Sequence, residues 1–300
     1  MKSFTIRVPA STANLGPAFD CLGLALDLWN ESHFEIEAEA FSISVSGEGQ
    51  NHLPLNSDNL IIQSMQYLYR QADHPFPEKL ALTCQNQVPL NSGLGSSSTA
   101  VVAGLLAANH MLGAPFSKTA LLRFAVDIEG HADNAAAALY GGLVLLTEDQ
   151  GEIRPHPIKI QELNCLIILP DINLSTLSAR SILPKNASLQ SAVFNISHAM
   201  WLLETFKSNN LEALRLAMQD QLHQVHRLAH LPGADEALLA ANRAGVAAAL
   251  SGAGPSLIAF IDSHRKEELS NLLKEPFTKR GISTRIYKLK NSQKGAEITK

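Results

Sequence analysis

Cysteine is scarce in this sequence. Only Cys21, Cys84 and Cys165 occur among 300 residues, their number is odd, and none stands in a CxxC spacing. Such a set indicates neither a disulfide framework nor a cysteine-ligated metal site. We therefore expect a protein of a reducing compartment.

An excess of one charge and long hydrophobic runs are also missing. The formal net charge is -4, and the basic residues are scattered except near the C-terminus. This distribution argues against a nucleic-acid-binding surface. The first residues, MKSFTIRVP, have no apolar signal core, and the alanine-leucine-valine runs are too short or too interrupted to cross a bilayer. We expect a cytoplasmic protein with no nucleic-acid or membrane partner.

The most informative stretch is residues 89–109, PLNSGLGSSSTAVVAGLLAAN, in which a glycine-serine loop runs directly into a helix-forming segment. Small residues let such a loop bend tightly and let its backbone approach a ligand. The free N–H groups and the positive end of the helix dipole favour an anion there. We predict a phosphate site, and an ordinary N-capped core helix is the alternative.

Three better-known glycine loops do not fit this stretch. A P-loop needs Lys-Ser/Thr after its last glycine, a dinucleotide fold needs a third glycine, and a protein kinase needs HRD-type and DFG motifs. The sequence has none of these features. The rest of the chain must identify the ligand.

Strand and helix patterns alternate along the whole chain, which predicts an α+β fold. Pro155 and Pro157, set among polar and charged residues, indicate a boundary. We predict an N-terminal domain over residues 1–155 and a C-terminal domain over residues 156–300.

Three local predictions bear on the site. Residues 8–28 are expected to form a small-residue loop that leads into an apolar stretch. Residues 33–39 and 41–45 are expected to be paired strands, and residues 210–230 a long helix.

That helix would carry His223, His226 and His230 near one face, where imidazoles could bind zinc. No carboxylate motif such as HExxH accompanies them. We therefore favour a hydrogen-bonded helix face near the ligand pocket.

Three glycine-bearing stretches occur in a characteristic order: VPASTANLGPAFD at 8–20, PLNSGLGSSS at 89–98 and SGAGPS at 251–256. Together they resemble the GHMP kinase superfamily, and the first two resemble its homoserine kinase branch. The segments IEGHADNAAAALYGG, LSARSILP and QLHQVHRLAHLPG look like further homoserine kinase segments, so the resemblance covers nearly the whole chain. Ala18 and Ala253 depart from the usual glycine and serine, but both are small.

The resemblance implies the fold and the reaction. It implies a two-domain GHMP kinase fold, with an N-terminal domain like ribosomal protein S5 domain 2 and a ferredoxin-like C-terminal domain. It also implies that ATP, with Mg²⁺, phosphorylates the hydroxyl of L-homoserine to give O-phospho-L-homoserine in threonine biosynthesis. Family members are often dimers, so a homodimer is expected.

The resemblance assigns the ATP and magnesium sites as well. Ser97 and Glu129 would bind Mg²⁺, a hard cation that prefers oxygen ligands. Asn59 would reach the adenine region. The residues implied around the phosphates are Pro89, Gly93, Leu94, Gly95, Ser96, Ser97 and Ser98.

The implied acceptor is a zwitterion, and both of its charges lose water on entering a pocket. By similarity Arg180 and Arg227 would bind the carboxylate and Asp20 the ammonium group. Asn14, His131, Asn134 and Thr176 would complete the substrate pocket. Asn14, Ser97 and Glu129 are the implied catalytic residues.

The mechanism is expected to depend on alignment and charge stabilisation. The aspartate-lysine base pair of the mevalonate kinases has no secure counterpart in this sequence. We therefore expect Asn14 to position the attacking hydroxyl rather than to act as a base.

Two other functions stay open. One is another GHMP kinase directed at a small alcohol such as mevalonate or shikimate, against which the two arginines and Asp20 argue. The other is a catalytically silent sensor of ATP and a second ligand, against which Glu129 and the serine loop argue. Taken alone, each arginine is equally compatible with a structural ion pair, and Glu129 with a charge near a helix end.

Overall fold

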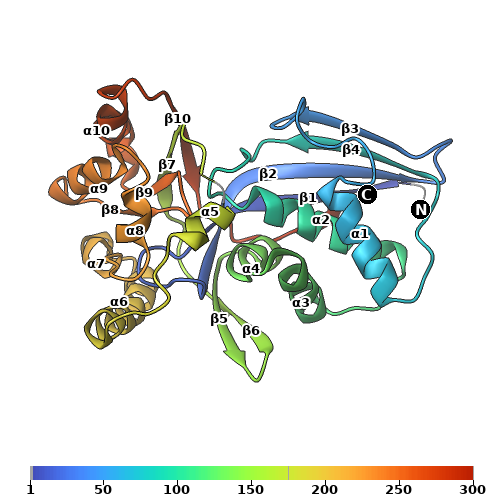
Figure 1. Cartoon of the computed structure of the whole chain (residues 1–300), viewed down its shortest axis with the longest axis horizontal. Helices are drawn as coiled ribbons and strands as arrows, with labels where there is room; N and C mark the ends of the chain where they lie inside the picture. Colours follow the sequence, from blue (N-terminus) through green and yellow to red (C-terminus); the bar gives the residue numbers. More distant parts are fainter. Residues whose placement is uncertain (1–2, 175, 300) are drawn as a thin grey trace.

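The computed structural model describes residues 3–174 and 176–299, with no side-chain description at 176 and 177. Two β-sheets organise these residues (Figure 1). The larger sheet has seven strands in the order β11-β1-β2-β4-β3, and β2 also pairs with β5, which pairs with β6. Its strands are β1 (Ser3–Ala13), β2 (Leu22–Ile36), β3 (Ser42–Gly47), β4 (Leu80–Asn86), β5 (Leu143–Asp149), β6 (Glu152–Ile158) and β11 (Glu297–Thr299).

Four helices lie along one side of this sheet (Figure 1). They are α1 (Leu60–Gln71), α2 (Ser96–Met111), α3 (Lys118–Glu129) and α4 (Asp133–Tyr140). Most residues of α2 are buried, which suits a helix that is apolar on all sides. Helices α1 and α2 approach so closely that a Cβ at Gly104 would lie 2.3 Å from the carbonyl oxygen of Ile61. This packing holds the middle of α2 against α1.

The smaller sheet is antiparallel, with the order β10-β7-β9-β8. Its strands are β7 (Asn164–Pro170), β8 (Ala247–Leu250), β9 (Leu257–Ile261) and β10 (Thr284–Lys290). Helices α9 (Ala234–Arg243) and α10 (Lys266–Thr278) pack on one face. In chain order the strands are arranged 4-1-3-2, which is the predicted ferredoxin-like topology.

Four further helices stand between β7 and α9 in the chain: α5 (Thr176–Ser181), α6 (Leu189–Ser208), α7 (Leu211–Ala217) and α8 (Gln224–Leu228). A short 3-10 turn, η1 (Ser263–Arg265), precedes α10. Helix α5 lies between the two sheets (Figure 1). No helix in the described ranges is long and apolar enough to span a membrane.

The two sheets share a hydrophobic core. Leu22, Leu24 and Leu26 of β2 pack in one cluster with Ile167 of β7 and Phe260 of β9. Burying each such side chain contributes about 1.5–3 kcal/mol. This shared core brings three segments together at one junction: the turn between β1 and β2, the loop before α2 and the 251–256 loop.

Three sequence-based expectations about local structure were wrong. Residues 8–28 are mostly strand, and residues 33–36 belong to β2 rather than to a hairpin. Strand β3 instead pairs in parallel with β4. The expected helix over 210–230 is divided into α7 and α8 because the side chain of Asp220 accepts hydrogen bonds from the backbone N–H groups of residues 222–224. Strand β6 crosses residue 155, and β11, from the end of the chain, pairs within the larger sheet. The domain division at residue 155 therefore stays a prediction.

Candidate active site

A cavity of about 330 Å³ opens at the junction, where α1, the loop before α2 and the 251–256 loop meet. Its size suits a small molecule. Eight of the predicted site residues line it: Asn59, Gly93, Gly95, Ser96, Ser97, Ser98, His131 and Asn134. Pro89 and Leu94 are instead buried behind the loop, which they support.

Gly93 and Gly95 are required by the path of this loop. Both have positive φ angles, and a Cβ at Gly95 would lie 2.2 Å from Ser11 Oγ. A Cβ at Gly93 would lie 2.2 Å from the carbonyl oxygen of Ser251, whose hydroxyl donates to the Gly93 carbonyl at 2.7 Å. The two glycines therefore allow β1 and the 251–256 loop to contact the Gly93–Ser98 loop directly.

Asn30, on β2, holds the start of this loop. Its Oδ1 accepts hydrogen bonds from the backbone N–H groups of Gln87 and Val88 at 2.8 and 2.9 Å. Its Nδ2 donates to Thr99 Oγ1 at 2.8 Å. Sequence analysis missed Asn30, although an asparagine inside a strand is uncommon and is a usable signal.

Gly95 caps α2 without any side-chain hydrogen bond, so the first amides of the helix are left for a ligand.

Glu129 ends α3 beside the start of α2. Ser98 Oγ donates to Glu129 Oε2 at 2.6 Å, and Ser98 is fully buried whereas Ser97 is exposed. Burial raises the pKa of Glu129, although His131 and hydrogen bonds from Ser98 and Ser97 oppose this shift. Across residues 3–174 and 176–299, no salt bridge reaches Glu129.

These residues fit a magnesium ion. A carboxylate that forms no salt bridge and lies next to hydroxyl oxygens is the ligand chemistry that Mg²⁺ prefers. Among the described residues there is no group of three or more His, Cys, Asp or Glu side chains able to hold a metal. Mg²⁺ does not require such a group, because one or two carboxylates with phosphate oxygens and water suffice.

His131 and Asn134 lie beside Glu129, at the start of α4. His131 Nδ1 is 3.3 Å from Asp133 Oδ1, and Asn134 Oδ1 accepts from Ser11 Oγ at 3.0 Å. Burial lowers the pKa of His131, but Asp133 and Glu129 outweigh burial and raise it overall. Asp133 is almost fully buried, and sequence analysis did not single it out.

Asp20 and Arg180 form a bidentate ion pair between the β1–β2 turn and α5. Arg180 Nη1 and Nη2 each lie 2.8 Å from a carboxylate oxygen of Asp20, and both side chains are about one-third exposed. Asn14 Oδ1 accepts from the backbone N–H of Asp20, while its Nδ2 donates to the carbonyl of Gly252, both at 2.9 Å. Asn14 therefore fixes the turn that carries Asp20.

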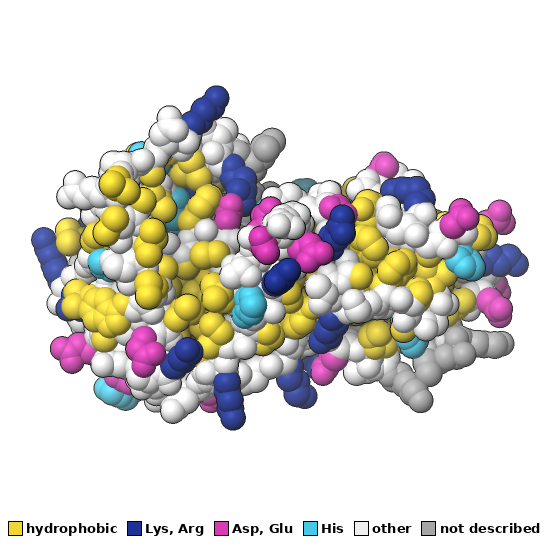
Figure 2. Space-filling model, turned by 90° about the horizontal axis from the view of Figure 1, so that it is seen from below, with side chains coloured by type: hydrophobic (Ala, Val, Ile, Leu, Met, Phe, Trp, Pro, Cys, Tyr) yellow, Lys and Arg dark blue, Asp and Glu magenta, His cyan; other side chains and the backbone are white. Residues whose placement is uncertain are grey.

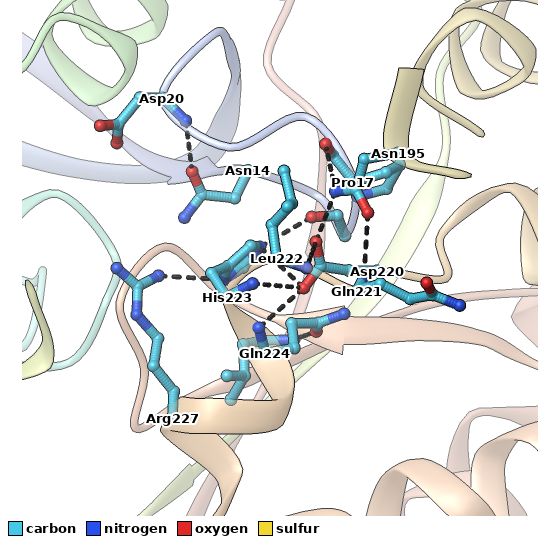
Figure 3. Close-up of polar contacts among 12 residues, drawn as sticks. Asn14, Pro17, Asp20, Asn195, Asp220, Gln221, Leu222, His223, Gln224 and Arg227 are labelled. Carbon is cyan, nitrogen blue, oxygen red and sulfur yellow. Dashed lines mark hydrogen bonds and ion pairs between the residues drawn. The ribbon is translucent and has the colours of Figure 1, made fainter. Parts of the chain in front are cut away.

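Arg227, on α8, is buried, with 2% of its surface exposed. Its Nη1 donates to His223 Nδ1 at 3.1 Å (Figure 3). The same Nη1 donates to the carbonyl of Gly252 at 3.1 Å, and Nε donates to the carbonyl of Ala179. No salt bridge to Arg227 occurs in the described part of the chain. A buried cation without an anionic partner is costly, so the site is built to receive an anionic group.

The roles of two other residues stay predictions. Asn59 lines the cavity and also caps α1, because its Oδ1 accepts from Ile61 N and its Nδ2 donates to the Pro54 carbonyl. Thr176 begins α5, and its side chain lies outside the described part of the structure.

Within the described ranges, His223, His226 and His230 do not form a group that could hold a zinc ion. His223 instead takes part in hydrogen bonds with Gly16 and Arg227, in keeping with the favoured hydrogen-bonded arrangement.

Comparisons with known proteins match both halves of the chain. The family described as GHMP kinases N terminal domain matches residues 59–142, and the family described as GHMP kinases C terminal matches residues 202–279. A homoserine kinase of Desulfitobacterium hafniense is 38% identical over 98% of this chain and 99% of its own length. One from Clostridium beijerinckii is 40% identical over 98% of each chain.

A solved structure agrees. The crystal structure of homoserine kinase from Cytophaga hutchinsonii matches with a TM-score of 0.87 at 28% identity, covering 99% of this chain and 98% of that one. The predicted GHMP kinase fold is therefore confirmed. The chain belongs to the homoserine kinase family of the GHMP kinases.

Proposed function

We propose that this chain transfers the terminal phosphoryl group of ATP to the hydroxyl of L-homoserine, giving ADP and O-phospho-L-homoserine for threonine biosynthesis. The observation that carries the choice of acceptor is Arg227, a buried cation without a carboxylate partner, close to the partly exposed Asp20–Arg180 pair. An amino acid supplies a carboxylate for the arginines and an ammonium group for Asp20.

ATP occupies the 330 Å³ cavity. Its phosphates lie against the Gly93–Ser98 loop, where free amides and the dipole of α2 attract anions. Asn59 forms part of the wall near the adenine, and Pro89 and Leu94 support the loop from behind. Glu129 and Ser97 would hold Mg²⁺, with Ser98 hydrogen-bonded to Glu129, and the ion would supply positive charge near the phosphates.

Homoserine binding exchanges one ion pair for two. Its ammonium group replaces Arg180 at Asp20, and its carboxylate is bound by Arg180 and Arg227. His131, Asn134 and Thr176 complete the pocket around the hydroxyl. Since a ligand charge compensates each group that the Asp20–Arg180 pair releases, opening this pair leaves no buried charge unpaired.

The chain's own residues need not supply a strong base. Asn14 positions the acceptor through the turn that it holds, and the hydroxyl attacks in line with the leaving ADP. The hydroxyl proton leaves late or passes to a phosphate oxygen, as expected for a loose transition state.

The deciding experiment measures Mg²⁺-dependent ADP release with L-homoserine, mevalonate, shikimate or no acceptor. Turnover with homoserine alone supports the proposal. Turnover with another alcohol would favour a different GHMP kinase activity. ATP binding without release by any acceptor would favour the sensor.

The chain is further proposed to act as a cytoplasmic homodimer. One face of α6 exposes four apolar side chains at helical spacing, Leu189, Val193, Ile196 and Met200, each more than half exposed. Figure 2 views the molecule from the side on which α6 lies and shows apolar side chains gathered there. A closed dimer would cover the same face on both copies. Light scattering of Ile196→Glu beside Gln190→Glu tests this, because only the first variant should become monomeric.

A further inference from the structure

His223 joins two parts of the proposed acceptor site. Its Nε2 lies 2.7 Å from the carbonyl oxygen of Gly16, in the β1–β2 turn, and its Nδ1 lies 3.1 Å from Arg227 Nη1 (Figure 3). The side chain is buried. The ring therefore connects two segments. One is the β1–β2 turn, which carries Asn14 and Asp20, and the other is α8, which carries the Arg227 guanidinium.

These partners determine where the imidazole proton resides. A carbonyl oxygen only accepts hydrogen bonds, so Nε2 must carry the proton. A guanidinium only donates, so Nδ1 must be the unprotonated acceptor. Both contacts are satisfied together only by the neutral ring protonated at Nε2.

We propose that neutral His223 is a positioning residue, which fixes the Arg227 guanidinium relative to the β1–β2 turn and thereby sets the affinity for homoserine and its dependence on pH. This inference rests on the proposed function, because it assumes that Arg227 binds the substrate carboxylate.

Both ends of the link are held firmly. A Cβ at Gly16 would lie 2.1 Å from the carbonyl oxygen of Met218, so the turn rests directly on the end of α7. Asn195 of α6 donates through Nδ2 to the carbonyl of Pro17 at 3.0 Å and to Asp220 Oδ1 at 2.6 Å. The backbone amides of His223 and Gln224 donate to Asp220 Oδ2. A ring held in this way transmits its orientation to Arg227.

The charged groups around the ring come from three segments. Asp220, before α8, has Oδ2 3.7 Å from Nε2, and Asp20 of the turn also favours a charged ring. Arg227 disfavours it, while the Phe19 ring lies 5.2 Å away and also faces Arg180. Burial is the largest influence, and the pKa of His223 is lowered from 6.5.

Protonation would destroy the link. A proton on Nδ1 would face the N–H of Arg227, so the guanidinium would lose an acceptor and meet a second positive charge. Because the folded pKa lies below 6.5, the stability that neutral His223 contributes is complete above this value and is lost as the pH falls through the folded pKa. Homoserine affinity should decline over the same range.

The test compares His223→Gln with His230→Gln, which changes an exposed histidine of the same segment. Glutamine can donate to Gly16 but cannot reach Arg227 at the same time. We expect His223→Gln to raise the KM for homoserine about tenfold or more, as for loss of a hydrogen bond to a charged group. The kcat and the KM for ATP should stay near wild type, and the rise in homoserine KM at acidic pH should disappear. His230→Gln should keep the wild-type profile.

A measurement on the wild-type protein does not depend on the variant folding. In ¹⁵N-labelled protein, two-bond proton–nitrogen correlations should show Nε2 of His223 protonated and Nδ1 unprotonated at neutral pH. A proton on Nδ1 would overturn the inference. It would also be overturned if His223→Gln left the homoserine KM and its pH profile unchanged, or raised the KM of both substrates equally. Absence of homoserine turnover by the wild type would instead overturn the proposed function and the inference together.

Discussion

The two sides of the site are built by different means. The nucleotide side comes mostly from consecutive residues of one loop, and within the described residues no salt bridge occupies the carboxylate of Glu129, although His131 acts on it electrostatically. The acceptor side combines the β1–β2 turn, α4, α5 and α8, and two of its charged residues, Asp20 and Arg180, already bind each other. The nucleotide side can bind its ligand without breaking an ion pair, whereas the acceptor side must first open the Asp20–Arg180 pair.

The largest effect on activity should come from Glu129→Gln, on the nucleotide side. Loss of the magnesium carboxylate should lower kcat about a thousandfold, equivalent to about 4 kcal/mol of transition-state stabilisation. Asp127→Asn, an exposed acid on the same helix, is the matched control. Steady-state kinetics at saturating Mg²⁺ checks the difference, and equal losses in both variants would contradict it.

The same variant separates charge from fold. Because burial raises the pKa of Glu129 above 4.5, the free energy of unfolding of the metal-free wild type should fall as the pH rises through the folded pKa. Glu129→Gln should lack this decline. Thermal unfolding against pH, with and without Mg²⁺, measures it, and stabilisation of the variant by Mg²⁺ would argue for a different ligand.

Arg227→Met should have the next largest effect, and only on the acceptor side. We expect the homoserine KM to rise about a hundredfold while the KM for ATP is unchanged, since a buried charge contact is lost. Stability should change little, because the variant also removes an unpaired buried cation. Kinetics and urea unfolding test both parts. An equal rise in the ATP KM would show that the two sides are not independent.

Gly95→Ala should have the smallest effect on activity, about a tenfold rise in the KM for ATP. The added Cβ meets Ser11 Oγ and also places alanine at a φ of 68°. Gly113→Ala, at a φ of 82° with no atom within 4 Å, isolates the backbone strain. Each variant should lose about 1 kcal/mol of stability from the strain, and only Gly95→Ala should lose ATP affinity. Isothermal titration with ATP makes the comparison.

The contrast between the two sides also explains what could be predicted from the sequence. The Gly93–Ser98 loop is local, so the sequence alone predicted a phosphate site there, and the resemblance then assigned its individual glycines and serines. Asn30 and the His223–Gly16 contact were missed because the partners of Asn30 lie 57 or more residues away in the chain and Gly16 lies 207 residues from His223. The resemblance named Arg227, but only the structure shows that it is buried without a carboxylate.

The fold shows a similar limit. The ferredoxin-like half was predicted correctly, but from the resemblance to the GHMP kinases and not from local sequence patterns. The break between α7 and α8 was not, because it depends on how Asp220 competes for backbone amides, and helical periodicity does not register this competition.

Strand β11 is translated after all the other strands of the larger sheet, so this sheet is completed late in protein synthesis. It pairs antiparallel with β1, Thr5 opposite Thr299, and Glu297 forms an ion pair with Arg7. While the ribosome is still translating the second half, this edge of β1 has no partner strand and exposes its backbone hydrogen-bonding groups. Cotranslational folding can therefore form the core around α2 early, but the sheet is completed only after the residues of β11 leave the exit tunnel.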